Sequence, residues 1–362
     1  MSLALSTVAT TALHNLDAIG EAVMKKTIMT MGLAATGLLA LGGQAQASTL
    51  EDVRDAGQLR CGVSNGLPGF SQPDSDGNWA GLDVDTCRAV AAAVLGDADA
   101  VEFIPLTAAE RFTALQSGEI DVLSRNTTWT TTRDASLGLN FTGTNYYDGQ
   151  GFLVKEALGV DSAYDLDGAA VCTQAGTTTE LNLADFFRAN DMDYEAVVFD
   201  TSEGSAQGFD NNRCDILTSD TSQLAALRTQ LSDPDSAVIL PEVISKEPLG
   251  PVVRQGDDEW FNVVKWVLFG QINAEEYGVD SSNVEEMTDS NNPNVQRILG
   301  ADGNMGEILG LDDDFMVEVI SEVGNYGEMF NRNVGPDTPV GLSRGVNALW
   351  TDGGILYAPP FR

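Results

Sequence analysis

Histidine is nearly absent from this chain, and its absence excludes several kinds of chemistry. The one histidine among 362 residues, His14, lies in an N-terminal segment that we expect to be removed. The remaining chain then has no imidazole base and no histidine ligand for a metal ion. A catalytic Cys–His pair is excluded for the same reason. We therefore expect neither a metal centre nor a cofactor.

Positive charge is scarce as well. Asp and Glu number 54 against 19 Lys and Arg, which gives a net charge of −35. Beyond the N-terminal segment the only lysines are Lys155, Lys246 and Lys265. Nucleic acids and anionic membrane surfaces repel a chain of this charge, so we expect neither as a partner.

The sequence also lacks an apolar run long enough to span a bilayer. Residues 28–41 are apolar, but they follow Lys25-Lys26 and precede a small-residue A-x-A site at 45–47. This pattern is typical of a cleaved secretion signal. We expect a signal peptide at about 24–47, with an N-terminal extension before it or a translation start at Met24. The mature chain, Ser48 to Arg362, is predicted to be exported without a lipid anchor or membrane insertion.

Cysteine is rare but informative. The four cysteines are even in number, widely spaced and all within the exported part: Cys61, Cys87, Cys172 and Cys214. In an exported protein this favours two disulfides over free thiols. The sequence alone leaves all three pairings open.

Strand-like and helix-like segments alternate over residues 58–124. Asp83 is the expected N-cap of the first helix and Gly96 its end. A capping box between Thr107 and Glu110 is expected to start the second helix. Strands separated by helices of this size predict parallel βαβ units and an α/β fold. The expected strands are 58–63, 101–106 and 120–124, and the expected helices are 83–96 and 107–118.

The same pattern begins again later in the chain. A strand, a Gly-Thr loop and a helix at 169–190 precede strands at 194–200 and 214–220. Aligned without gaps, 119–126 and 213–220 share an aspartate and a leucine. The match indicates either two ordinary buried strands or two α/β lobes of similar build.

Two extended segments, 149–156 and 247–260, flank the second half. Two such crossings predict a discontinuous first lobe, 48–150 with 252–362, and an inserted second lobe with the hinge strands, 151–251. Ligands of open α/β sheets bind beyond the carboxyl ends of the strands. Those ends carry the hydroxyl-rich stretches "RNTTWTTTR", "TQAGTTT" and "TSDTS". We therefore expect a ligand in a cleft between the lobes.

Several long stretches resemble one known family. "GLDVDTCRAVAAAV" (81–94) and "LQSGEIDVLSRNTTWTTTRDASLGLNFT" (115–142) are similar to motifs of the periplasmic amino-acid-binding proteins of ABC importers, solute-binding protein family 3. Thr86 departs from that family, which usually has an apolar residue there. The resemblance covers about Leu50 to Gly335. "NYYDGQGFLVK", "EPLGPVVRQGDDEW", "GNYGE" and the tail "NALWTDGGILYAPPFR" look like its general L-amino-acid-binding branch.

The resemblance implies a two-lobe periplasmic-binding-protein fold of type II, with a two-strand hinge and a ligand cleft. It also implies a monomeric periplasmic protein that binds free L-amino acids broadly by cleft closure. Such a protein delivers its ligand to an inner-membrane ABC permease with its ATPase. We predict the disulfides Cys61–Cys87 and Cys172–Cys214, each within one lobe, because a bridge between lobes would lock the cleft.

The resemblance further assigns residues to the two charged ends of an amino acid. Arg133 matches the arginine that binds the carboxylate, supported by Thr128 and, from the second lobe, by Thr178. Asn126 matches a residue that contacts the ligand through its backbone. Asp220 matches the acid that takes the α-ammonium group.

The ligand side chain is assigned less directly. Leu67 falls where many relatives place an aromatic ring on that side chain, and Phe70 lies near it in the sequence. With an aliphatic residue at this position, we expect a looser pocket that suits broad specificity.

Elementary chemistry supports the two charged assignments. A planar guanidinium can bind both oxygens of a carboxylate, and an ionised aspartate only accepts hydrogen bonds. Each residue also has an ordinary interpretation. Arg133 could be an exposed surface charge, Asp220 a helix cap, the threonines a polar loop, and Trp129 part of the core.

Two other functions compete with binding. An enzyme on the same fold, such as a dehydratase, needs a cleft carboxylate as acid or base, and Asp220 is the one obvious candidate. An amino-acid sensor module would need a signalling element, and the sequence has no kinase or coiled coil. We expect binding without turnover.

Overall fold

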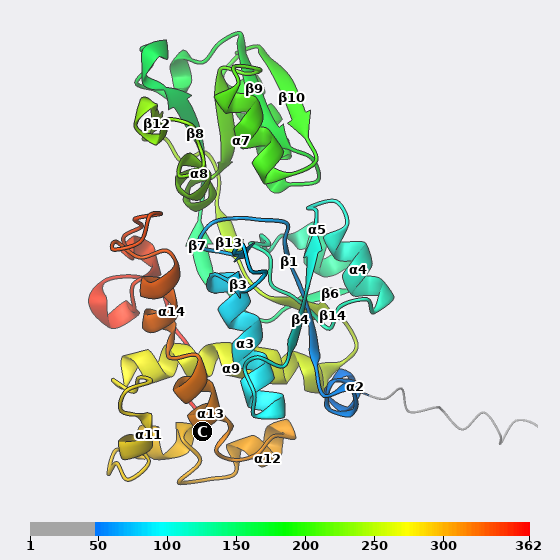
Figure 1. Ribbon diagram of the computed structural model, residues 1–362, viewed down its shortest axis with the longest axis vertical. Helices are drawn as coiled ribbons and strands as arrows, with labels where there is room; N and C mark the ends of the chain where they lie inside the picture. The colour runs from blue at the N-terminus through cyan, green and yellow to red at the C-terminus, as the bar shows by residue number, and fades with distance from the viewer. Residues whose placement is uncertain (1–47) are drawn as a thin grey trace, which may run out of the picture. The chain divides into compact units, whose positions relative to one another are not determined.

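The computed structural model describes residues 48–362. The predicted signal peptide and the extension before it lie outside the described residues, so both stay predictions. Within 48–362 no helix combines the length and the apolar character needed to cross a membrane. The described chain forms two α/β lobes, each built on a five-stranded sheet (Figure 1).

The sheet of lobe 1 has the order β4-β1-β5-β14-β6. Its first three strands run parallel, whereas β14 is antiparallel to both of its neighbours. β14 joins this sheet although it follows all strands of lobe 2 in the sequence. The bounds are β1 (Leu59–Ser64), β4 (Val101–Leu106), β5 (Val122–Leu123), β6 (Leu139–Phe141) and β14 (Val252–Arg254).

Helices pack on both faces of this sheet. α3 and α9 share a core with alternate residues of β1, namely Leu59, Cys61 and Val63. α4 packs on the other face, over the core that contains Leu123 and Val252. The helices around this sheet are α2 (Thr49–Ala56), α3 (Leu82–Leu95), α4 (Arg111–Ser117), α5 (Thr131–Ser136) and α9 (Asp258–Glu276).

The sheet of lobe 2 has the order β10-β9-β11-β8-β12. It also has three parallel strands followed by two antiparallel pairings. α6 (Thr178–Ala189), α7 (Ser202–Asp210) and α8 (Thr221–Arg228) pack against it. The strands are β8 (Gln150–Lys155), β9 (Ala169–Gln174), β10 (Tyr194–Phe199), β11 (Ile216–Asp220) and β12 (Ala237–Ile239).

The two sheets are alike in detail as well as in order. Leu123 of β5 pairs with Gly62 of β1, and Leu217 of β11 pairs with Cys172 of β9. Asp121 and Asp215, just before these strands, each accept a hydrogen bond from the backbone of the neighbouring strand. The short sequence match between 119–126 and 213–220 therefore reflects two lobes of similar build.

A two-stranded antiparallel ladder connects the lobes. It pairs β7 (Tyr146–Asp148), where the chain leaves lobe 1, with β13 (Glu247–Leu249), where it returns. Thr128 forms an isolated bridge to Leu249 of this ladder. The loop after β5 is thus tied directly to the connection between lobes.

The C-terminal third adds helices and a tail to lobe 1. The helices are α10 (Val284–Met287), α11 (Pro293–Ile298), α12 (Met305–Leu309), α13 (Phe315–Glu322) and α14 (Tyr326–Asn333). The tail after α14 contains only two short 3-10 turns, η5 (Gly345–Asn347) and η6 (Trp350–Asp352). Phe361 near the end of the tail packs against Trp266 of α9, with ring centroids 5.1 Å apart.

The helix starts differ from the predicted ones in an instructive way. α3 begins after Gly81, not after Asp83, so the predicted N-cap was wrong. Gly81 has φ +136°, and a Cβ there would lie 2.0 Å from the backbone oxygen of Phe70, which excludes any other residue. The capping box of Thr107 and Glu110 forms as predicted, but in the turn before α4.

Both predicted disulfides are present. Cys61 on β1 joins Cys87 on α3 in lobe 1, and Cys172 on β9 joins Cys214 just before β11 in lobe 2. Neither bond crosses between the lobes. Both leave the connecting ladder unconstrained.

Candidate ligand-binding site

A small cavity of about 20 Å³ lies where residues of both lobes meet. A space of this size holds about one water molecule. Lobe 1 contributes residues from α4 and from the loop after β5, and lobe 2 contributes residues from the ends of β9 and β11 and from the first turns of α6 and α8. The lining residues are Arg111, Arg125, Asn126, Thr128, Gln174, Thr177, Thr178, Thr179, Ser219, Asp220 and Gln223.

Three side-chain atoms at this cavity are buried without a hydrogen-bond partner: Nε of Arg111, Oδ1 of Asn126 and Oδ1 of Asp220. A buried polar group without a partner costs free energy, so proteins rarely leave one unpaired. Three at one small cavity, with donors and acceptors among them, indicate a place for a polar ligand.

Asp220 ends β11 and is 5 % exposed. Its backbone caps α8, but its side chain makes no capping hydrogen bond. Burial raises the pKa of Asp220 well above its ordinary value, and the nearby carboxylates of Asp148 and Glu247 raise it further. A cation at this carboxylate would offset both effects. The interpretation of its side chain as a helix cap is therefore not supported.

Arg133 lies in α5, whose N-cap Thr130 accepts a hydrogen bond from the Arg133 backbone. Arg133 as a whole is 7 % exposed, and its guanidinium donates to the carbonyl of Thr128 at 2.9 Å and lies over the ring of Phe112. Burial lowers the pKa of Arg133, while Glu247 and Asp220 act in the opposite direction. The alternative of an exposed surface charge is excluded.

Arg133 does not itself line the cavity. It supports the loop that does, because Thr128 lines the cavity and receives the guanidinium on its carbonyl. Its direct contact with a ligand carboxylate therefore stays a prediction.

Side chains from the two lobes contact each other across the cavity. Asn126 donates to Oε1 of Gln223 at 2.7 Å, and the hydroxyls of Thr128 and Thr178 are 3.3 Å apart. Thr178 also bonds to the carboxylate of Glu247 at 2.8 Å. These contacts describe lobes that are closed on each other.

Two arginines at the cavity were missed by sequence reasoning. Arg111 is 2 % exposed, and burial lowers its pKa well below the ordinary value, aided by Arg133 and Arg125 and opposed by Asp220. Arg125 donates to the carbonyl of Leu106, and its burial lowers its pKa to about 10. Arg111 lies in a predicted helix and Arg125 follows a predicted strand, and a charged residue at either place is normally exposed.

Two acids of the connecting ladder were missed as well. Asp148 accepts hydrogen bonds from the side chain of Thr221 and the backbone of Ser222 at the start of α8. Burial raises the pKa of Asp148. Glu247 accepts from Thr178 and Asn182 of α6. Extended segments gave no sign in the sequence that their acids would face the cavity region.

Leu67 and Phe70 do not line the cavity. Each is 1 % exposed, and the Phe70 ring packs edge-on against Tyr146 at 5.7 Å. Their contact with a ligand side chain stays a prediction in this closed arrangement. Trp129 is 39 % exposed and stacks on Phe141, so it belongs to neither the core nor the cavity lining.

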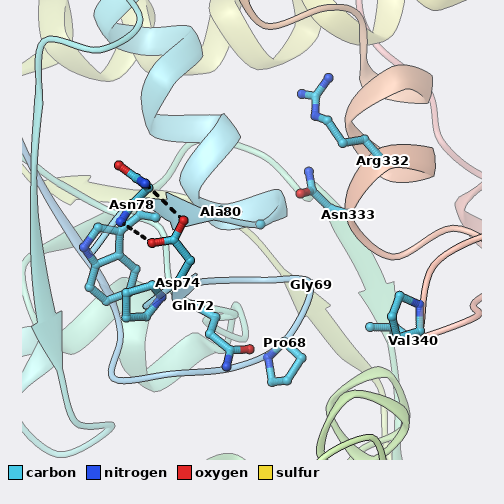
Figure 2. A pocket seen from close by; sticks show the side chains of 13 residues that line it. Pro68, Gly69, Gln72, Asp74, Asn78, Ala80, Arg332, Asn333 and Val340 are labelled. Carbon is cyan, nitrogen blue, oxygen red and sulfur yellow. Dashed lines mark hydrogen bonds between the residues drawn. The ribbon is translucent and has the colours of Figure 1, made fainter. Parts of the chain in front are cut away.

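A larger hollow of about 420 Å³ lies elsewhere on lobe 1, between the 68–81 loop and α14 (Figure 2). Its charged groups are already paired. Asp74 accepts from the backbone and side chain of Asn78, and Arg332 pairs with Asp85. Within 48–362 no group of three or more acidic, cysteine or histidine side chains could hold a metal ion. The small cavity between the lobes remains the candidate site.

Comparisons with known proteins point the same way. The family described as bacterial extracellular solute-binding proteins, family 3, matches residues 59–278. The general L-amino acid-binding periplasmic protein AapJ of Rhizobium johnstonii is 54 % identical over 94 % of this chain and 100 % of its own length. The glutamate/glutamine/aspartate/asparagine-binding protein BztA of Rhodobacter capsulatus is similar at 54 % identity over the same shares.

A solved structure is similarly close. It is an ABC transporter periplasmic binding protein from Brucella ovis with glutathione bound, at 55 % identity and a TM-score of 0.86. The match covers 88 % of this chain and 100 % of that one. The fold of this chain is therefore shared with a periplasmic binding protein.

Proposed function

The chain belongs to the bacterial extracellular solute-binding proteins, family 3, and we propose that it is the substrate-binding component of an ABC importer for L-amino acids. It acts outside the inner membrane, captures its ligand between the lobes and delivers it to a permease coupled to an ATPase. The names of the two relatives support amino acids as the ligand class and a broad choice among them.

One observation carries this proposal: unpaired groups of opposite charge meet at the cavity between the lobes. Asp220 from lobe 2 offers a buried carboxylate oxygen, and Arg111 from lobe 1 offers a buried Nε–H. An amino acid brings an ammonium and a carboxylate on one carbon, so a single ligand can pair both. The hydroxyls of Thr128 and Thr178 add donors from each lobe.

The magnitudes are sufficient for useful affinity. Charge-assisted hydrogen bonds contribute about 1.5–3 kcal/mol each. Four or five of them, reduced by the free energy of desolvation and ordering, reach the ~8 kcal/mol that corresponds to micromolar binding.

Cleft closure follows from the same contacts. A cavity of about 20 Å³ cannot admit an amino acid, so the lobes must separate for the ligand to enter. The ladder of β7 and β13 is the connection about which they would move. A ligand that contacts both lobes favours the closed state, which a permease can distinguish from the open one.

The buried arginines extend the ligand range toward acidic compounds. Arg111 and Arg125 lie at the cavity in addition to Arg133 beside it. A second anionic group on a ligand would therefore find a guanidinium near it. The glutathione in the Brucella structure and the acidic amino acids in the name of BztA agree with this range.

The protein is proposed to act as a monomer and without catalysis. An enzyme would need Asp220 as its acid or base, whereas here Asp220 is assigned to the ligand ammonium. Overnight incubation with bound amino acids, followed by chromatography, checks this assignment. Quantitative recovery of the ligand is expected, and any product would show an enzyme.

Calorimetric titration of the mature chain with L- and D-amino acids and with glutathione tests the proposal. We expect stoichiometric binding of several L-amino acids and its loss in Arg133→Ala. Arg188→Ala serves as the control, because Arg188 is an exposed arginine of lobe 2 paired only with Asp185. Absence of binding to every compound would refute the proposed function.

A further inference from the structure

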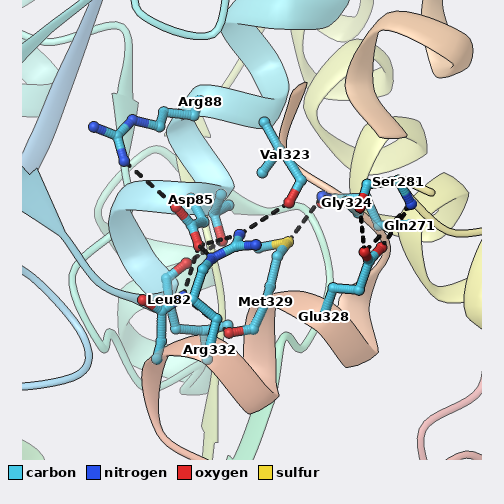
Figure 3. A network of polar contacts seen from close by, with 12 residues as sticks. Leu82, Asp85, Arg88, Gln271, Ser281, Val323, Gly324, Glu328, Met329 and Arg332 are labelled. Atoms are coloured by element: carbon cyan, nitrogen blue, oxygen red, sulfur yellow. Dashed lines mark hydrogen bonds and ion pairs between the residues drawn. The ribbon is translucent and has the colours of Figure 1, made fainter. Parts of the chain in front are cut away.

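Two acidic residues in the first turn of α3, Asp83 and Asp85, are both buried. Figure 3 shows the surroundings of Asp85, which pairs with Arg332 at 2.6 Å and also accepts from Asn333. Asp85 therefore ties α3 to α14 within lobe 1. Asp83 makes no hydrogen bond to these residues, so packing against α14 does not explain why Asp83 is buried.

Asp83 faces the loop that lines the cavity. Its carboxylate accepts a hydrogen bond from the backbone N–H of Asn126 at 2.9 Å and from the hydroxyl of Ser124 at 3.2 Å. The side chain is 3 % exposed, and Arg125 is the charged group that acts on it. All three contacts lie in the loop directly after β5.

This loop has a backbone that needs support. Asn126 has φ +34°, in the left-handed region, which asparagine adopts more often than other residues with a side chain but still uncommonly. Such a conformation persists only where the surroundings hold it. The bond from Asp83 to the Asn126 N–H holds that residue.

Asn126 is also the residue that joins the lobes. Its side-chain nitrogen bonds to Gln223 of lobe 2, while its Oδ1 is one of the three unpaired atoms at the cavity. A change in its backbone would move both contacts. The carboxylate of Asp83 is thus linked to the site through a single residue.

We propose that Asp83 is a positioning residue for ligand binding, which fixes the backbone of Asn126 so that its side chain faces the cavity and lobe 2. It touches no ligand itself. The inference rests on the proposed function, since it concerns the same cavity. It assigns a role in binding to one acid of a sequence motif whose other acid, Asp85, is structural.

The test compares three variants of the mature chain by calorimetric titration with L-glutamate. Asp83→Ala removes the acceptor, and the dissociation constant should rise about tenfold to 100-fold, as for a lost charged hydrogen bond. Asp83→Asn keeps a carbonyl oxygen at the same place and should recover part of that loss. Asp85→Asn, the matched control, should lower the melting temperature but leave the dissociation constant of the folded protein unchanged.

Hydrogen–deuterium exchange over residues 124–128 separates positioning from general stability. Asp83→Ala should increase exchange in this loop but not in β1 or β9. The pH profile gives a second measure, since burial raises the pKa of Asp83 to about 6. Wild-type affinity should fall as Asp83 is protonated below that pH, and Asp83→Asn should lack this step.

Three results would overturn the inference. One is a dissociation constant for Asp83→Ala within twofold of the wild type. The others are unchanged exchange in the loop and equal pH profiles. A wild-type chain that binds neither L-glutamate nor any other amino acid would instead refute the proposed function. The exchange measured over residues 124–128 would still show whether Asp83 holds that loop.

A different observation carries a second inference, about the C-terminal tail. The carboxamide of Asn347 accepts from the backbone N–H of Tyr147 at 2.7 Å and donates to its carbonyl at 3.0 Å. Tyr147 is the middle residue of β7 and lies opposite Pro248 of β13, whose carbonyl accepts a hydrogen bond from the backbone of Trp129. Asn347 thus replaces a neighbouring strand on the free edge of the connecting ladder.

The tail itself is fixed to lobe 1. Arg344 pairs with both oxygens of Glu275 at 2.9 and 3.1 Å and donates to the carbonyl of Asn347. Its guanidinium lies over the rings of Tyr326 and Phe330. Through Asn347 the tail connects α9 and α14 to β7.

We infer that the tail, which is fixed to lobe 1 and bonded to the middle of β7, restrains the connecting ladder and so slows the release of a ligand held between the lobes. Asn347→Ala should raise exchange at residues 146–148 and increase the ligand dissociation rate about fivefold or more, a usual size for coupling between sites. The exposed Asn331→Ala on α14 is the control. Faster exchange together with a dissociation rate within twofold of the wild type would contradict the inference, because the contact of Asn347 with β7 would then have no effect on ligand release.

Discussion

Replacing Asp220 by asparagine should stabilise the ligand-free protein and, in the same molecule, remove ligand binding. The carboxylate is buried, one of its oxygens has no partner, and Asp148 and Glu247 repel its charge. These are the features expected of a group that pairs with a ligand cation rather than with the protein. If Asp220 instead served stability, its replacement by asparagine would destabilise the ligand-free protein and leave ligand binding intact.

The sign of the stability effect follows from the pKa. Because the pKa of Asp220 is raised in the folded protein, folding favours its protonated form. The stability that this gives is present at low pH and is lost as the pH rises through the raised pKa. The ionised side chain is therefore unfavourable in the ligand-free protein, and a neutral isostere removes that penalty.

The magnitudes can be set from the same contacts. A buried polar group without a partner costs about 1–3 kcal/mol, which bounds the gain in the free energy of unfolding. A charged hydrogen bond to the ligand contributes about 1.5–3 kcal/mol, so each lost bond weakens binding roughly tenfold to 150-fold. With two bonds to the ammonium lost, a micromolar ligand would no longer be detected.

Scanning fluorimetry and calorimetric titration at pH 7 measure the two effects. The ligand-free melting temperature of Asp220→Asn should exceed that of the wild type, and added amino acid should not raise it further. Asp185→Asn, at an exposed position of α6, should match the wild type in both. A lower melting temperature together with retained binding would refute the assignment of Asp220 to the ligand.

Three further predictions concern the frame of the site. Removing the lobe 2 disulfide by Cys172→Ser with Cys214→Ser should lower the free energy of unfolding by about 2–5 kcal/mol, measured by urea denaturation; an unchanged midpoint would contradict it. Gly81→Ala places a carbon 2.0 Å from a backbone oxygen and should prevent accumulation of folded protein, so normal expression with a native circular dichroism spectrum would show the reasoning wrong. Affinity for neutral amino acids should weaken as the pH falls through the raised pKa of Asp220, and an affinity that does not change as the pH is lowered would contradict this.

Much of the fold was accessible from the sequence because its signals are local. Glycines at helix ends, such as Gly96 and Gly118, take left-handed conformations that end α3 and α4 as expected. The alternation of strands and helices predicted the α/β class, whereas the match between 119–126 and 213–220 left two ordinary buried strands and two similar lobes equally open. The start of α3 was misplaced because aspartate is a common N-cap residue, whereas the carboxylate of Asp83 accepts a hydrogen bond from the distant backbone N–H of Asn126.

The residues of the site were predicted only in part, and the ones that were missed have a physical reason in common. Asp220 and the threonines follow strands, and the ends of strands meet at a predictable edge of a sheet. Arg111 lies within a helix, and nothing in its neighbours shows that the helix turns this side chain inward. Asp148 and Glu247 lie on extended segments, whose facing depends on the register of the ladder between β7 and β13. Register and facing are set by tertiary contacts that a single sequence does not display.

A crystal structure of the mature chain with a bound L-amino acid tests the central claim most directly. We expect the ligand between the lobes, its ammonium within hydrogen-bond distance of Asp220 and its carboxylate beside the guanidinium groups of lobe 1. A ligand bound outside this cavity, or one bound there with its ammonium turned away from Asp220, would contradict the account.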